Sequence, residues 1–295
     1  MELRVLKYYL AVVREGSILG AANALHIAQP SLSRQMHDLE NEIGKPLFIR
    51  SNRRITLTEE GILLRNRAAE ILELVQKTES ELAEDHKNII GDVCIAAANY
   101  DSFRFVAELQ KSIQEDHPQI CFKYTTGDGE YVRNQLDLGL ADFGIVIEPF
   151  DLTDFEYVQL PETEVLGIMM RDDWELAQYE FLTPDQLIGI PLLIPKQFKD
   201  MGFLRRMLHV SNEELIDIRG IIDNPYNGAL MVQSGIGYAL CIDFDLITLS
   251  KANHLVFRPL SPEVKSCSFV IWKKYQYFSH ASEVFLSSLK TTANE

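Results

Sequence analysis

The side chains best able to do chemistry near the start of the chain are hydrogen-bonding groups and cations. Within one predicted helix they are Gln29, Ser31, Ser33, Arg34 and His37. An arginine on an exposed helix face can make paired hydrogen bonds to guanine, while amide and hydroxyl groups bond to bases or phosphate oxygens. This set therefore predicts recognition of duplex DNA. An ordinary pair of helices with a solvated face is the alternative for this stretch alone.

Three short helices are expected to position these groups. Apolar residues recur at helical spacing before Gly16, and Ser17 can cap a second helix. Pro30 suits the first turn of a third helix, which should end at Gly44. The residues expected to be buried by the third helix are Leu32, Met36, Leu39 and Ile43. Two helices joined by a tight turn, the second with a polar face, indicate a helix-turn-helix.

A cationic hairpin is expected directly after the third helix. Residues 47–49 and 55–57 are predicted to be short strands. The polar turn between them carries Arg50, Arg53 and Arg54, which are placed to contact phosphates or the minor groove. A solvated loop is the alternative interpretation, but its position behind a helix-turn-helix favours a DNA-binding wing.

The run GSILGAANALHIAQPSLSRQMHDLENEIGKPLFIRSNRRITLTEEG resembles the DNA-binding domain of the LysR-type regulators. The matching elements are Gly16-Ser17, Ala21-Ala22, Leu25, Gln29-Pro30-Ser31-Leu32-Ser33, Leu39-Glu40, Gly44, Leu47-Phe48, Arg50, Arg53 and Leu57-Thr58 with Gly61. The resemblance implies DNA contacts from Gln29, Pro30, Ser31, Ser33, Arg34, Arg50, Arg53 and Arg54. The chain departs from the family at Ile18-Leu19-Gly20, where an aromatic residue and a threonine are frequent, so no polar contact from Leu19 is implied.

A long helix is predicted to follow the wing, capped by Thr58 and running to about Asp85. Its apolar seam is Leu64, Ala68, Ile71, Val75, Thr78 and Leu82. A stripe of this kind on a long helix needs a partner. The seam is expected to form a dimer, with packing on the chain's own effector domain as the alternative. The dimer is favoured because LysR-type regulators use this helix as their dimer arm.

From Gly91 onward, short apolar strands alternate with helices. The first five are expected over 92–98, 103–116, 120–125, 130–139 and 143–147. A strand–helix–strand–helix–strand order predicts a parallel sheet with right-handed crossovers. Further elements are expected over 165–171, 191–194, 201–209, 220–222, 227–234, 238–242, 268–273 and 278–290. The fold class is therefore α/β.

Ligands of open parallel sheets bind beyond the carboxyl ends of the strands, and the loops there combine glycine with hydrogen-bonding side chains. The pieces LDLGLADFGIVIEP and GALMVQSGIGYALCI resemble the two-subdomain, doubly wound effector domain of LysR-type regulators, which is similar to periplasmic solute-binding proteins. The resemblance implies a small-molecule inducer held in the cleft by Asn99, Tyr100, Asp101, Ser102, Thr126, Gly127, Lys196 and Asn227. Lys196 hints at a carboxylate-bearing ligand, and ordinary solvated loops are the alternative. Cys241-Ile242 departs from the family, which usually places a proline there.

The expected organisation is a winged helix-turn-helix over 1–58, a dimerising linker helix over 59–88 and an effector domain over 89–295. Within the effector domain, subdomain I covers about 91–161 and 267–295, and subdomain II covers about 162–266. Residues 1–57 hold eight Lys/Arg and five Asp/Glu, whereas residues 91–295 hold sixteen and thirty. The acidic bulk would be repelled by phosphates, so DNA is expected to meet one end only.

Composition and motifs exclude several other classes. No signal peptide or membrane span is recognised, so a cytoplasmic location without a membrane partner is expected. Cys94, Cys121, Cys241 and Cys267 are expected to be reduced and buried, and the scattered histidines predict no metal site. No GxSxG, GxxxxGK[ST] or HExxH motif occurs, so neither an enzyme nor a cofactor is expected.

The leading hypothesis is thus a ligand-responsive transcription factor. Its partners would be promoter DNA, an inducer and a second copy of itself, as a homodimer or a dimer of dimers, with RNA polymerase a further candidate. The alternatives are a cytosolic solute-binding protein, which the arginine-rich wing argues against, and an enzyme on the same fold, which lacks a clustered acid–base set. The sequence indicates neither the ligand nor the regulated genes, nor whether the protein activates or represses.

Overall fold

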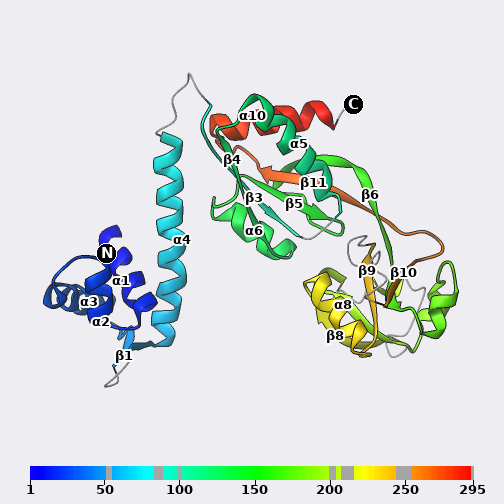
Figure 1. Ribbon diagram of the computed structural model, residues 1–295, viewed down its shortest axis with the longest axis horizontal. Coiled ribbons are helices and arrows are strands. Elements are labelled where there is room, and N and C mark those ends of the chain that lie inside the picture. The colour runs from blue at the N-terminus through cyan, green and yellow to red at the C-terminus, as the bar shows by residue number, and fades with distance from the viewer. Residues whose placement is uncertain are drawn as a thin grey trace. The chain divides into compact units, whose positions relative to one another are not determined.

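The computed structural model describes residues 1–50, 55–82, 89–98, 101–198, 204–206, 216–243 and 254–293. The chain divides into two compact units, Met1–Ala83 and Glu84–Glu295 (Figure 1). Among the described residues, none of the helices combines the length and the apolar character that crossing a membrane requires.

The N-terminal unit contains the predicted helices and hairpin. Its elements are α1 (Leu3–Glu15), α2 (Ile18–Ala24), α3 (Gln29–Ile43), β1 (Phe48–Arg50), β2 (Ile55–Leu57) and α4 (Glu59–Leu82). Gly16 and Gly44 adopt left-handed conformations at the ends of α1 and α3, as a residue without a β-carbon readily does. The hydroxyl oxygen of Ser17 accepts a hydrogen bond from the Gly20 N–H, which confirms the expected cap of α2.

A single core joins α4 to the three helices before it. Leu32, Met36 and Leu39 are buried in this core together with Tyr9, whose hydroxyl donates to the Gly61 carbonyl at 2.6 Å. Burial raises the pKa of Tyr9 to about 12, so the phenol stays a neutral donor.

The expectation that Ile43 is buried is wrong, because its side chain is 38% exposed. Gly44 ends α3 one residue later, and the chain then turns back so that Leu47 and Phe48 enter the core. Their N–H groups both donate to the carboxylate of Glu40, which holds this return against α3. The last turn of the helix is therefore left outside the core.

The C-terminal unit is an α/β structure around a long mixed sheet. Its helices among the described residues are α5 (Phe103–Asp116), α6 (Gly129–Asp137), α8 (Pro225–Gln233) and α10 (His280–Thr292), with 3-10 turns at Glu175–Gln178, Pro184–Leu187 and Lys196–Phe198. Its strands are β3 (Gly91–Ala97), β4 (Ile120–Thr126), β5 (Phe143–Ile147), β6 (Phe155–Arg171), β7 (Pro191–Pro195), β8 (Asp217–Ile222), β9 (Tyr238–Ile242), β10 (Leu255–Pro259) and β11 (Lys265–Lys273). Of the helix expected over 201–209, only residues 204–206 lie within the described residues.

The strand order is β4-β3-β5-β11-β6-β9-β7-β8, and β10 pairs with β6. Strand β3 is parallel to β4 and β5, which confirms the predicted parallel arrangement. Strand β11 is antiparallel to both β5 and β6, so the whole sheet is mixed. Figure 1 shows α5 and α10 on one side of the β3–β5 portion and α6 on the other.

Two lobes meet along the long strand β6. Its first part, up to Val165, pairs with β11, and its last part, from Leu166, pairs with β9 and β10. One lobe has a core of apolar residues around Phe143 and Phe285, and the other has its own core around Leu192 and Leu240. The subdomain boundaries expected from the sequence fall inside β6 and β11.

The expected burial of all four cysteines is wrong in part. Cys241 is buried, Cys94 and Cys267 are half-buried, and Cys121 is exposed. Strand β4 lies at the edge of the sheet, where side chains on the uncovered face remain in solvent. Burial raises the pKa of the Cys241 thiol to about 12, which keeps it protonated and unreactive near neutral pH.

Candidate DNA-binding surface and effector pocket

The polar face of α3 is open to solvent. Gln29, Pro30, Ser31, Arg34 and His37 are exposed. Ser33 is half-buried on the same helix. Ser33, Arg34 and His37 lie between the buried Leu32, Met36 and Leu39, and the other three residues form the turn before Leu32, so the helical period turns the set away from the core.

Arg34 is the main cation on this face. Its side chain is 84% exposed and approaches Asp38, one helical turn further along α3, at 4.0 Å. A contact this long at an exposed site contributes little free energy. The guanidinium can therefore turn toward a phosphate or a base edge at small cost.

The hairpin after α3 has the predicted form. Strands β1 and β2 are antiparallel, and the Ile55 N–H donates to the Gly16 carbonyl at 3.0 Å, which ties the hairpin to the end of α1. Arg50 is the last residue of β1. Arg53 and Arg54 lie outside the described residues, as does the side chain of Arg50.

The apolar seam expected on α4 is divided between two surroundings. Ala68 is fully buried, with Leu64 partly buried beside it, in the core of the N-terminal unit. Leu63, Ile71 and Leu74 remain 60%, 36% and 41% exposed. Part of the predicted seam is thus used within the unit, and a second apolar stripe is left on the outside of the helix.

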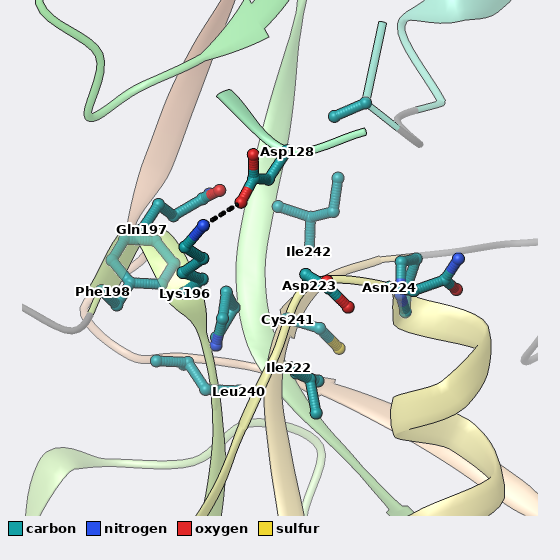
Figure 2. A pocket seen from close by; sticks show the side chains of 13 residues that line it. Asp128, Lys196, Gln197, Phe198, Ile222, Asp223, Asn224, Leu240, Cys241 and Ile242 are labelled. Carbon is teal, nitrogen blue, oxygen red and sulfur yellow. Dashed lines mark hydrogen bonds and ion pairs between the residues drawn. The ribbon is translucent and has the colours of Figure 1, made fainter. Parts of the chain in front are cut away.

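The C-terminal unit has a cavity of about 60 Å³ where strands from both lobes end (Figure 2). Its lining among the described residues is Ala98, Asp128, Pro195, Lys196, Gln197, Phe198, Ile222, Asp223, Asn224, Pro225, Leu240, Cys241 and Ile242. Ala98 and Asp128 follow β3 and β4, whereas the rest lie at the ends of β7, β8 and β9 or just beyond them. This is the position at which open α/β sheets bind ligands.

Lys196 connects the two lobes across this cavity. Its Nζ donates to Asp128 Oδ2 at 2.6 Å and to Glu130 Oε2 at 2.9 Å (Figure 2 shows the first contact). Asp128 also caps α6, because its other carboxylate oxygen accepts the Tyr131 N–H at 2.8 Å. Burial acts to raise the pKa of Asp128, but hydrogen bonds from Lys196 and the Tyr131 N–H outweigh it and hold this pKa below its usual range.

A second cavity, of about 320 Å³, shares Lys196 and Asp128 with the first. Its other charged residues are Glu130, Arg133 and Asp151. The Arg133 guanidinium lies 3.5 Å from an Asp154 carboxylate oxygen and stacks over the Phe155 ring, with its carbon 4.9 Å from the ring centre. Both cations of this cavity are therefore already bound within the protein.

Two family models match this chain. One describes bacterial regulatory helix-turn-helix proteins of the lysR family and matches residues 3–62, and the other describes the LysR substrate binding domain and matches residues 86–294. The chain belongs to the LysR family of bacterial transcriptional regulators. Its first domain is a DNA-binding helix-turn-helix and its second is a substrate-binding domain, so it regulates transcription and is not an enzyme.

One relative and one solved structure span nearly the whole regulator, and a second structure spans its effector domain. The Hca operon transcriptional activator HcaR of Escherichia coli is 28% identical over 282 residues, which cover 93% of this chain and 92% of that protein. The crystal structure of full-length CbnR with its target DNA covers 99% of this chain and 100% of that chain, at 19% identity and a TM-score of 0.76. The effector-binding domain of QuiR in complex with shikimate covers 70% and 98%, at 14% identity and a TM-score of 0.61.

Of the effector-binding residues expected from the sequence of this LysR regulator, one described residue lines the cavity, some lie elsewhere and some lie outside the described residues. Lys196 lines the cavity, whereas Asn99 and Tyr100 lie outside the described residues. Ser102 is fully buried, with its N–H donating to Glu164 at 2.8 Å and its hydroxyl to Ser268 at 3.0 Å. The others border neither of the two cavities: Asp101, Thr126, Gly127 and Asn227. Their roles in ligand binding remain predictions.

Sequence reasoning missed several lining residues of the regulator's cavity. Asp128 directly follows Gly127, in a loop already singled out at the end of a strand. Asp223 and Asn224 come directly after β8, and the same rule applied to that strand would have found them. The apolar lining from β9 carries no such signal, because buried strand residues look alike whether or not they border a cavity.

The described residues of the regulator include no group of three or more His, Cys, Asp or Glu side chains placed to hold a metal ion.

Proposed function

We propose that this LysR regulator binds promoter DNA as a homodimer, or a dimer of dimers, and changes its DNA contacts when a small molecule occupies the cavity between the lobes. The observation that carries the DNA-binding part is the exposed face of α3, with Arg34 projecting from the second helix of the helix-turn-helix. DNA in bacteria is cytoplasmic, which gives the proposed location.

Base and phosphate contacts would come from the exposed face of α3 and from the wing. Arg34 is suited to a bidentate contact with guanine, and the residues of the first turn can bond to bases or phosphates. The wing arginines Arg50, Arg53 and Arg54 would contact the backbone or the minor groove. His37 lies one turn beyond Ser33 and would add a contact at the edge of the groove.

Self-association is supported by the outer apolar stripe of α4. Leu63, Ile71 and Leu74 keep 60%, 36% and 41% of their surface exposed, and a second copy of the helix would remove that surface from water. Two paired helices would present two α3 faces to successive turns of a duplex.

Ligand control would operate by population shift. A ligand that contacts both lobes would favour one relative arrangement of the lobes over another in proportion to its differential affinity. The effector-binding domain of QuiR has been solved in complex with shikimate, which supports a small molecule here. HcaR is a transcriptional activator, which makes RNA polymerase a candidate partner.

The DNA contact can be tested by fluorescence anisotropy on a duplex selected from random sequence and on a scrambled duplex. Arg34→Ala is expected to weaken the selected duplex by about 1–3 kcal/mol and to reduce sequence preference, because a bidentate base contact is lost. Arg4→Ala is the matched control, since Arg4 is an exposed arginine on α1 that already pairs with Glu2 at 3.2 Å.

Arg53→Ala should weaken both duplexes alike and reduce the dependence on salt, as loss of a phosphate contact does. If Arg34→Ala and Arg53→Ala both bind the two duplexes as the parent protein does, the assignment of DNA contacts is wrong.

A further inference from the structure

Negatively charged side chains outnumber positively charged ones around the two cavities. Among the described residues, the carboxylates are Asp128, Glu130, Asp151 and Asp223, whereas the cations are Lys196 and Arg133. Each cation is within 4.0 Å of a carboxylate. Among these described groups, an incoming anion meets an excess of like charge, and both cations are already paired.

Lys196 is a poor binding group for an anionic ligand in this arrangement. It contacts two carboxylates at once, at 2.6 and 2.9 Å, and these contacts raise its pKa. A ligand carboxylate would have to compete with both, and separating Lys196 from Asp128 would leave the latter carboxylate without its counter-ion. The hint of an acidic ligand that Lys196 gives in the sequence is thus opposed by its surroundings.

Asp223, unlike Lys196, has no charged partner among the described residues. It lines the smaller cavity, and no hydrogen bond or ion pair joins it to any of the described residues. Figure 2 shows Asp223 beside Asn224, on the side of the cavity away from the Lys196–Asp128 pair. The side-chain oxygen of Asn224 accepts the Tyr226 N–H at 2.9 Å, so it is committed to capping α8. Among the described charged residues of this cavity, Asp223, which is exposed, is therefore the one that a ligand can reach without breaking an existing contact.

The remaining lining is largely apolar. Phe198, Ile222, Leu240 and Ile242 border the cavity together with Pro195. Such a surface favours a hydrocarbon body, while a polar group at one end fixes its orientation.

We propose that the effector carries a positively charged amino group on a short apolar body, with Asp223 as the counter-ion and the apolar strand ends around the body. This proposal rests on the proposed function, since it names the class of ligand that the same cavity takes. A charge-assisted hydrogen bond from the ligand's ammonium group to the carboxylate would add to the affinity and fix the orientation of the ligand. The Lys196–Asp128–Glu130 cluster would stay intact beside the bound molecule.

Calorimetric titration of the full chain with three molecules of one shape tests the proposal. The probes are 3-methylbutan-1-amine, 3-methylbutanoate and 3-methylbutan-1-ol, which share one branched body and differ in the charge of the head group. The amine is expected to bind more tightly than the other two. In Asp223→Asn the amine should lose about tenfold or more in affinity, as expected for removal of a charged hydrogen-bond partner.

Two further variants separate Asp223 from general charge effects. Asp217→Asn removes a carboxylate at the opposite end of β8, where Asp217 pairs with Arg219 at 2.8 Å, and should leave amine binding unchanged. Lys196→Gln removes a cation from the cavity lining and leaves Asp128 and Glu130 without their counter-ion, so the affinity for the amine should rise.

Binding of the acid in preference to the amine, with loss of that binding in Lys196→Gln, would overturn the proposal and leave the effector cavity itself in place. Equal affinity of the amine for Asp223→Asn and the parent would also overturn it, as would absence of binding by all three probes. The DNA-binding assays with Arg34→Ala do not involve the cavity, so they report separately on the proposed function.

Discussion

The cations of the two units are in opposite situations. Arg34 on α3 is 84% exposed and lies 4.0 Å from the Asp38 carboxylate, whereas Lys196 in the second unit contacts Asp128 and Glu130 at 2.6 and 2.9 Å. The first arrangement leaves a positive group available to an external anion, and the second does not. A positively charged residue at a candidate site thus indicates an anionic partner only when the protein has not already matched its charge.

The largest expected effects are losses of unfolding free energy from substitutions in the separate cores of the two units. Leu32→Ala removes a fully buried side chain of α3, and Phe285→Ala removes one from α10. Losses of about 2–5 and 3–5 kcal/mol in unfolding free energy are expected, from the lost transfer energy and the cavity left behind. Chemical denaturation followed with DNA-binding and ligand-binding readouts checks both.

Leu32→Ala should abolish DNA binding and leave ligand binding intact. In Phe285→Ala, ligand binding should be lost at a lower denaturant concentration than DNA binding. A single unfolding transition that shifts equally in both variants would contradict independent cores.

The outer stripe of α4 gives the next largest expected effect. Leu74→Asp places a charge in the proposed dimer contact, and the dissociation constant of the dimer should rise at least about tenfold, because burial of a leucine contributes about 1.5–3 kcal/mol. Light scattering coupled to size-exclusion chromatography, over a dilution series, measures this.

Glu73→Gln serves as the control, because this neighbouring position on α4 is already polar and exposed. If Leu74→Asp has the same mass as the parent at every concentration, the dimer does not use this stripe.

A substitution at Gly127 can show whether this residue of the second unit acts in packing or in ligand binding. A β-carbon at this position would overlap the Tyr131 side chain. Gly127→Ala is therefore expected to lower the unfolding free energy of the ligand-free protein by about 1–3 kcal/mol through overpacking.

In the double variant Gly127→Ala/Tyr131→Ala, removal of the crowding ring should restore part of the lost unfolding free energy. Thermal unfolding of the single and double variants measures this difference. A loss that appears only when ligand is present would instead show that Gly127 acts by contacting the ligand.

The smallest expected effect is the dependence on pH of the Lys196 cluster. The lowered pKa of Asp128 means that its contribution to stability is full above its unfolded-state pKa and is lost as pH falls through the lower folded-state value. Lys196→Gln should therefore reduce stability by about 1 kcal/mol at neutral pH, since the pair is partly exposed, with the side chain of Lys196 at 47% and that of Asp128 at 20%.

The difference between Lys196→Gln and the parent should begin to shrink below about pH 4, because the carboxyl of Asp128 is protonated first in the unfolded chain and only at lower pH in the folded protein. Denaturation curves between pH 3 and 7 check this, and a difference that grows on acidification would contradict it.

Local signals in the sequence were sufficient for the N-terminal unit. The helix caps at Gly16, Ser17 and Gly44 and the hairpin strands depend on neighbouring residues, and all were predicted. Ile43 was misplaced because its burial depends on where the chain returns after Gly44. That return is set by contacts that helical spacing does not encode.

The effector cavity depends on tertiary contacts, and its prediction was correspondingly partial. The rule that ligands bind at strand ends indicates Lys196 after β7, and the same rule extends to Asp223 after β8. The partners of Lys196 come from another lobe, 66 and 68 residues away in sequence, so its pairing with two carboxylates could not be predicted from its neighbours.

The proposed DNA-binding dimer is tested most directly by measuring stoichiometry and affinity on a selected duplex over a range of salt concentrations. Two chains per duplex are expected, or four if two dimers bind together. The logarithm of the association constant should fall linearly with the logarithm of salt concentration, with a slope of about −0.9 for each phosphate contacted. A protein that stays monomeric and binds no duplex at low salt would contradict the account.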